Sequence, residues 1–208
     1  MRTLLRLVSV VALVLFCLAV WVGVRAWLAK DHLENAAAEV KQLQTQVERG
    51  QTKPATATLS RLQGETKDAV RLTGDPIWRA AQHLPVVGDD LRAIHVVSVA
   101  GHTVSIDSLP PLAQAAADVG QVSATGAGLS PAQLIAAARR LKAPLTTAQA
   151  GVATAQAQIA TIDTSQLFSP VRTGVNQLSS GLQTLHTELT ALLTADKAAL
   201  QAAAALGG

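Results

Sequence analysis

The sequence predicts an all-α protein in which an N-terminal transmembrane helix precedes an extended helical bundle of coiled-coil-like hairpins. Residues 7–24 form an uncharged apolar run, and the C-terminal third carries Leu, Val and Ile at alternating spacings of three and four. Hydrophobic residues are 49% of the 208-residue chain, but aromatic residues are only 2%. Because alanine and other small side chains each bury little area, we expect stabilisation to be spread along helix seams and not gathered in an aromatic core.

The apolar run Leu7–Val24 (LVSVVALVLFCLAVWVGV) is long enough, with its flanks, to cross a bilayer. About 20 helical residues span a hydrocarbon core of roughly 30 Å. Tryptophans toward its C-terminal end suit the membrane interface, and arginines bound it on both sides. We predict a membrane helix over residues 7–28 after a cytoplasmic stub of residues 1–6. The expected anchoring residues are Arg6, Trp21, Arg25 and Trp27.

A cleaved signal peptide is the main alternative to an anchor. Its apolar stretch would cover about 7–15 residues before a small-x-small site. This run is longer, and the best candidate site, Val24-Arg25-Ala26, is poor. Arg2 and Arg6 favour a cytoplasmic N-terminus with the bulk of the chain outside the cell membrane.

Residues 29–73 are expected to form a juxtamembrane helical stalk or hairpin, which Gly50 and Pro54 interrupt. Two apolar stripes at spacings of three and four support it. The first consists of Leu33, Ala36, Val40, Leu43 and Val47, and the second of Leu59, Leu62, Thr66, Ala69 and Leu72.

Residues 74–125 are expected to form short helices around a Trp/Pro corner. Asp75 is the predicted N-cap of a helix with Pro76 at its first position. Trp78 is expected to pack under the turn at Pro85–Gly88, with its indole N–H bonded to a carbonyl. Asp89 and Asp90 are expected to cap the next helix at the positive end of its dipole. The candidate corner residues are Asp75, Pro76, Trp78, Pro85, Gly88 and Asp89, and a ligand site is the less favoured interpretation of this cluster.

Residues 91–107 fit a helix but contain enough β-branched residues to make a strand, and helix is the preferred interpretation. Pro110-Pro111 is expected to begin a separate helix that ends before a loop over residues 123–130.

Residues 130–206 are expected to form an antiparallel hairpin of two heptad helices joined near residues 163–169. Pro144 and Pro170 should kink or start these helices, and partial disorder is an alternative for residues 195–208.

The sequence offers no candidate catalytic, cofactor-binding or metal site. His95 and His102 lie seven residues apart without a carboxylate partner, and solvated histidines are the expected interpretation. The single cysteine excludes an intramolecular disulfide and a Cys-based metal site. The net charge of +3 is spread without an aromatic-rich basic face, so nucleic acid is not an expected partner.

The segments Asp-Pro-x-Trp-Arg and Leu-Pro-x-Val-Gly-x-x-Leu-Arg, read from Asp75 to Arg92, resemble the N-terminal portion of the actinobacterial membrane protein family called domain of unknown function 4012. The resemblance covers residues 7–110. It implies a place at the cell envelope and a further exported domain after the helical region. Because the signature of that domain does not occur in this sequence, the resemblance implies a truncated or split member.

The expected function is therefore that of a non-enzymatic, membrane-anchored extracytoplasmic helical module of the bacterial cell envelope. Its expected partners are the lipid bilayer and a helical protein or a second copy of itself. A ligand-sensing domain that acts through a partner, and the N-terminal fragment of a larger envelope enzyme, are the alternatives.

Overall fold

The structure is a computed structural model that describes the backbone of residues 2–124 and 131–206. Side chains are described for residue 21 and from residue 23 onward, except at positions 48, 52, 119–135, 137, 138, 196, 199, 200 and 202–208. Residues 2–124 and 131–206 contain no strand, so the all-α prediction is confirmed. The elements are α1 (Arg2–Glu48), α2 (Thr52–Thr73), α3 (Pro76–Ala81), α4 (Gly88–Thr103), the π-helical turn η1 (Val104–Ser108), α5 (Leu109–Ala124), α6 (Pro131–Ile159) and α7 (Ser169–Leu206).

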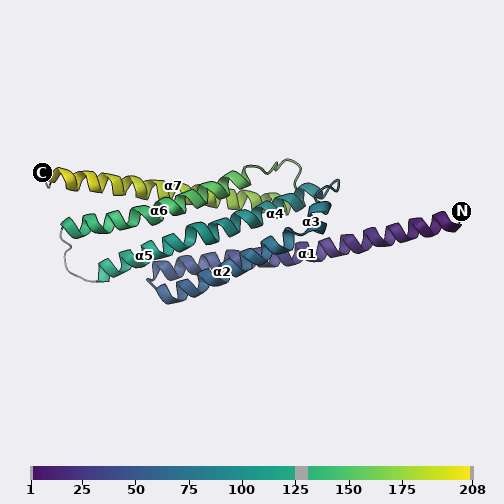
Figure 1. The fold of residues 1–208 in the computed structure, drawn as a ribbon, viewed down its shortest axis with the longest axis horizontal. Coiled ribbons are helices and arrows are strands. Elements are labelled where there is room, and N and C mark those ends of the chain that lie inside the picture. Colours follow the sequence, from purple (N-terminus) through teal and green to yellow (C-terminus); the bar gives the residue numbers. More distant parts are fainter. Residues whose placement is uncertain (1, 125–130, 207–208) are drawn as a thin grey trace.

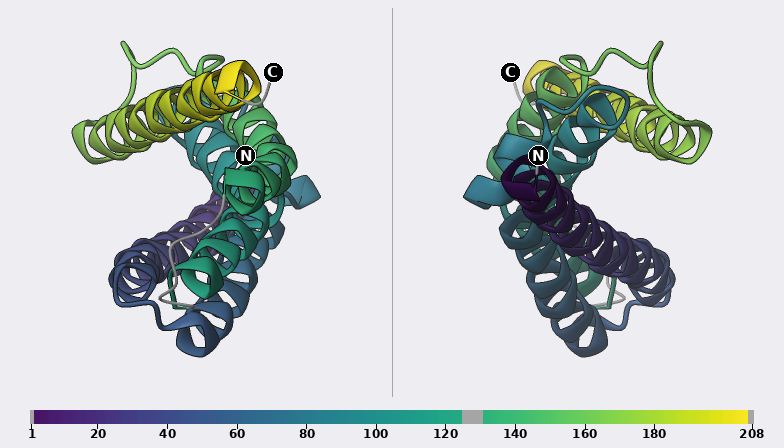
Figure 2. Two further views of the ribbon diagram at one scale, coloured as in Figure 1. Left: turned by 90° about the vertical axis from the view of Figure 1, so that its left-hand side faces the viewer. Right: turned by 90° about the vertical axis from the view of Figure 1, so that its right-hand side faces the viewer.

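The helices form an elongated array in which each one packs mainly on its neighbours (Figure 1). Helix α1 packs on α2, α2 packs on α4, α4 and α5 pack on α6, and α6 packs on α7. Seen from the end, the array is curved, with the α1–α2 pair at one end of the curve and the α6–α7 pair at the other (Figure 2). The rod formed by α4, η1 and α5 thus joins two antiparallel hairpins.

Helix α5 begins at Leu109, next to the predicted start at Pro110, but it continues α4 through η1, so residues 88–124 form one unbroken rod. The N–H of Leu109 donates to the carbonyl of Val104, five residues back. Pro110 and Pro111 have no N–H to donate. A π-helical turn directly before them changes the hydrogen-bond register, and the helix continues past them. Helix also covers residues 91–107, which confirms the preferred interpretation of that segment.

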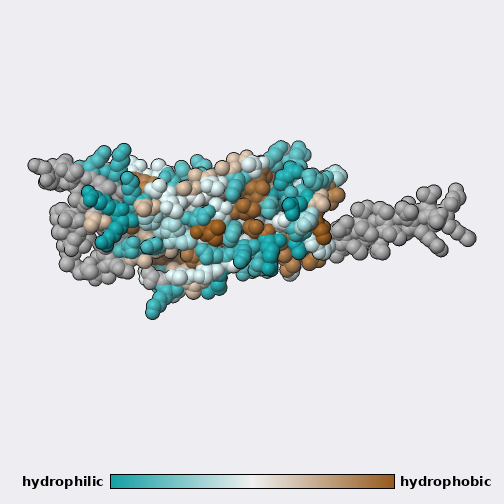
Figure 3. Space-filling model, viewed as in Figure 1, coloured by the Kyte–Doolittle hydropathy of each residue, from teal (hydrophilic) through white to brown (hydrophobic). Residues whose placement is uncertain are grey.

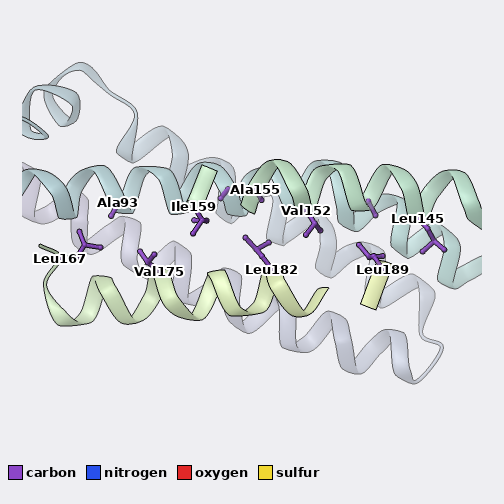
Figure 4. Close-up of a cluster of buried hydrophobic side chains, with 11 residues drawn as sticks. Ala93, Leu145, Val152, Ala155, Ile159, Leu167, Val175, Leu182 and Leu189 are labelled. Carbon is purple, nitrogen blue, oxygen red and sulfur yellow. The ribbon is translucent and has the colours of Figure 1, made fainter. Parts of the chain in front are cut away.

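The main hydrophobic core lies between α4, α6 and α7 (Figure 4). Helix α7 contributes apolar residues at intervals of seven, namely Val175, Leu182 and Leu189. They face the small and branched side chains of α6. Alanines of α4, Ala93 and Ala100, close the core from the other side. Large residues of α7 at seven-residue intervals, packed against a regularly spaced apolar face of α6, are typical of heptad packing.

Among the described side chains, most residues of the predicted apolar stripes are buried or half-buried. Val40 and Val47 on α1 are exposed because α1 turns the series Ala29, Ala36 and Leu43 toward α2. Leu192 on α7 is also exposed. Pro144 lies inside α6, and Pro170 lies in the first turn of α7. Helix α7 continues to Leu206, into the range for which disorder was the alternative.

The apolar run Leu7–Val24 belongs to α1, a single helix of 47 residues. Among the residues whose side chains the structure describes, no helix is both long and apolar enough to cross a membrane. Most of Leu7–Val24 lies outside those residues. The N-terminal part of α1 projects beyond the other helices at one end of the bundle (Figure 1).

Candidate functional site

The densest set of long-range side-chain contacts lies at the corner where α1 leaves the bundle. This corner is formed by α3, the start of α4 and the adjoining part of α1. We call it the corner site, and define it by Arg25, Asp75, Trp78, Asp90 and Leu91. Its first element is the N-terminus of α3. Asp75 Oδ1 accepts the N–H of Ile77 at 2.8 Å and that of Trp78 at 3.0 Å, and Pro76 occupies the first turn. The predicted N-cap is confirmed.

Trp78 fills the centre of the corner site and is fully buried. Its indole Nε1–H donates to the carbonyl of Leu91 at 3.1 Å, which confirms the predicted bond from the indole to a backbone carbonyl. The apolar side chains around the ring are Ala81, Leu91, Ile94 and, from α1, Ala26, rather than Val86 or Val87 of the predicted covering turn. The cluster centred on Trp78 therefore connects α3 to both α4 and α1.

Arg25 connects the predicted anchor to the predicted corner. Its Nη1 pairs with Asp75 Oδ2 and donates to the carbonyl of Leu72 at 3.1 Å. On the other side, the guanidinium lies 4.3 Å from the ring centroid of Trp21, a cation–π arrangement. Asp75 thus uses one carboxylate oxygen to cap α3 and the other to hold α1. Sequence reasoning missed this bridge, because nothing in a local pattern links residues separated by 50 positions.

The turn between α3 and α4 is tight and exposed. A Cβ at Gly88 would overlap the carbonyl oxygen of Gln82 and lie 2.9 Å from its carbon, so only glycine fits there. Pro85 is exposed in this turn. Val86 has a φ of 78°, a left-handed conformation that is rare for a β-branched residue, and its exposed fraction is 78%.

Asp89 and Asp90 lie in the first turn of α4, at the positive end of its dipole, as predicted, but neither side chain caps the helix. Val87 occupies the N-cap, and no side chain caps the helix there. Asp89 is exposed and lies 3.3 Å from Arg92. Asp90 is buried, and its Oδ1 accepts the N–H of Phe168 at 2.9 Å. Asp90 therefore ties the connection before α7 to the corner site, a role that no local sequence pattern indicates.

Of the other expected anchoring residues, Arg6 lies outside the residues with described side chains. Trp27 is 66% exposed beside the corner site. Lys30, one turn further along α1, pairs with Glu34 at 2.6 Å.

His95 and His102 are half-buried against α2, so the solvated interpretation of these histidines is wrong. His95 Nδ1 lies 3.2 Å from Thr73 Oγ1, and His102 Nδ1 lies 3.1 Å from Thr66 Oγ1. Burial, with a contribution from the charge of Arg79, lowers the pKa of His95. This polar seam between α2 and α4 sets their register. In the part of the chain with described side chains, no group of three or more His, Cys, Asp or Glu could hold a metal ion.

The corner site joins α1 to α3 and α4, and its five defining residues include no nucleophile–base pair. Comparison with known proteins adds no further constraint. No family model, no curated protein and no solved structure matches this chain.

Proposed function

We propose that the chain is a single-pass membrane protein in which the N-terminal part of α1 crosses the bilayer and the helical array stands outside the cell membrane as a non-enzymatic spacer or scaffold. The proposal includes the orientation expected from Arg2 and Arg6, with the N-terminus in the cytoplasm. The resemblance carried by residues 75–92 supports a place in the bacterial cell envelope.

The observation that carries the proposal is the projection of α1 (Figure 1). The projecting part contains the eighteen uncharged residues Leu7–Val24. At 1.5 Å per residue this run is about 27 Å long, close to the thickness of a hydrocarbon core. A helix that is apolar all round needs an apolar environment, and the other helices do not extend over this part of α1.

The corner site supports the proposed spacer role. Arg25 follows the apolar run directly and is held by Asp75, by the Leu72 carbonyl and by Trp21. The buried cluster of Trp78, Ala81 and Leu91 adds apolar contact with the next residue, Ala26. Such a joint would hold the array at a fixed angle to the anchor and transmit force between them. The expected partners are the bilayer and a helical protein, or a second copy of the chain.

Membrane fractionation of the full chain tests the proposal. We expect the protein to stay in the membrane pellet after alkaline carbonate washing. The double variant Val11→Arg/Leu15→Arg should move to the soluble or aggregated fraction, because each charge near a bilayer centre costs about 2.5–3.5 kcal/mol. Gln183→Arg, on an exposed position of α7, is the matched control and should behave like the parent. Release of the parent protein by carbonate would contradict the proposal.

A further inference from the structure

Exposed apolar side chains gather at the end of the bundle from which α1 projects. Leu84, Val86 and Val87 lie in the turn between α3 and α4, with exposed fractions of 50%, 78% and 37%. Phe168, 51% exposed, joins them because its N–H is held by Asp90 at the start of α4. Apolar residues are visible at this end, next to the projecting part of α1 (Figure 3). We call Leu84, Val86, Val87 and Phe168 the apolar tip.

The apolar tip stands level with the end of the apolar run of α1. Asp75, the N-cap of α3, pairs with Arg25, and the apolar cluster around Trp78 packs on Ala26; Arg25 and Ala26 are the two residues that follow Val24. Trp27, with an exposed fraction of 66%, lies at the same level on α1. A bilayer that covered Leu7–Val24 would therefore have its interface at the height of the tip.

The backbone at Val86 provides an independent observation. Valine at a φ of 78° is strained, and glycine or asparagine would relieve the strain at no cost in burial, because Val86 is exposed. Strain that packing does not explain points to a use for the side chain. An apolar side chain at the outermost point of a turn has a use if the turn meets an apolar surface.

We propose that the apolar tip inserts into the interfacial layer of the bilayer that α1 crosses, so that the bundle has a second contact with the membrane beside its anchor. The inference rests on the proposed membrane span of α1. The occupant is the lipid surface, because the tip lies at the level where the apolar run Leu7–Val24 ends, which is the height at which the hydrocarbon would end. Aliphatic and aromatic side chains favour this layer. Two contacts fix the tilt of the bundle, which one helix alone would leave free.

Quenching of a site-specific fluorophore by brominated lipids tests the inference in the full chain. Cys17 is the only cysteine, so a bimane label on it reports on the span itself. In a Cys17→Ser background, Val86→Cys and, independently, Leu84→Cys place the label on the tip. Leu192→Cys is the matched control, because Leu192 is apolar and 54% exposed but belongs to the far half of α7. Each protein is reconstituted into phosphatidylcholine vesicles with a minor phosphatidylglycerol fraction.

We expect lipids brominated near the headgroup end of the acyl chain to quench the label at positions 86 and 84 strongly, and the label at 192 weakly. Quenching at 17 with none at 84 and 86 would overturn the inference and leave the membrane span intact. If the labels at positions 84 and 86 were protected from aqueous iodide as well as from the brominated lipids, the tip would be covered by a protein partner or a second copy. That result would also overturn the inference. Absence of quenching at all positions, including 17, would overturn the proposed function.

Discussion

Arg25 and Asp75 are the two residues on which the junction between α1 and the bundle depends. The carboxylate of Asp75 divides its oxygens between the N-terminus of α3 and the guanidinium of Arg25. The pair is largely shielded from solvent, with side-chain exposures of 28% and 19%, so it is less weakened by water than a surface pair. Loss of the Arg25–Asp75 ion pair and loss of the Asp75 helix cap should have different consequences. Two substitutions of Asp75 can separate these effects.

Replacement of Asp75 by alanine should lower the free energy of unfolding by about 1–3 kcal/mol, because the cap and the ion pair are lost together. Asp75→Asn keeps the capping oxygen and loses the charge, so a smaller loss of about 1 kcal/mol is expected. Hydrogen exchange at the amides of Ile77 and Trp78 should accelerate in the alanine variant and not in the asparagine variant. Equal acceleration in both variants would contradict the division of roles between the two oxygens.

His95 should make stability depend on pH. Its pKa is lowered in the folded protein by burial and by Arg79, so below its usual pKa of about 6.5 the unfolded chain binds the proton more readily. The stabilising contribution of neutral His95 is thus complete above about pH 6.5 and is lost as the pH falls through the lowered folded pKa. His95→Asn should reduce the loss of unfolding free energy between about pH 7.5 and pH 5.5, measured by urea denaturation. An unchanged loss would assign the pH dependence to other groups.

At the scale of elements, the features that the sequence predicted well are local. The start of α3 was predictable because an Asp-Pro pair caps and begins a helix through contacts within three residues. The interruption near Gly50 was predictable because glycine readily adopts a left-handed conformation, and Gly50 has a φ of +67°. The helix across Pro110-Pro111 was not predictable from local rules, since proline usually begins or ends a helix. The π-helical turn η1 and its contact with α6 overcome that preference.

The contact between η1 and α6 depends on Gly151. A Cβ at this position would overlap Ser108 Oγ and lie 3.0 Å from Asp107 Cβ. Gly151→Ala should therefore destabilise the protein by about 1–3 kcal/mol through overpacking, measured by chemical denaturation. Gly181→Ala, on an open position of α7, should instead stabilise it by about 0.5–1 kcal/mol.

Ser108 provides a double-mutant test of that contact. Ser108 Oγ donates to the carbonyl of Ala148 at 3.0 Å, so Ser108→Ala alone should lose about 1 kcal/mol. The double variant Ser108→Ala/Gly151→Ala lacks the serine oxygen that obstructs the new alanine methyl group. Its loss of unfolding free energy should therefore be smaller than the sum of the losses of the two single variants. Strict additivity would mean that Gly151 is required for another reason.

At the scale of the whole molecule, the order of neighbours could not be predicted. The faces of α1, α2, α4 and α6 are rich in alanine, which packs equally well against many partners. What selects the neighbours is a set of sparse long-range contacts: Arg25 with Asp75, Asp90 with Phe168, and the seam of His95 and His102 with α2. These contacts join residues far apart in sequence, and no spacing rule reveals them.

The curved array and the projection of α1 give the molecule a direction. The corner site and the apolar tip lie at one end, and the turn between α1 and α2 lies at the other (Figure 1). If α1 crosses the bilayer, that turn is the part of the α1–α2 hairpin farthest from the membrane. The two ends of α1 should therefore lie in different compartments.

Cysteine accessibility at the two ends of α1 tests this central claim most directly. In a Cys17→Ser background, single cysteines replace Thr3 and Gln51, and whole cells are treated with a membrane-impermeant maleimide. We predict labelling at position 51 in intact cells and at position 3 only after permeabilisation. Labelling of both positions in intact cells, or of neither until the cells are opened, would contradict a membrane span between them.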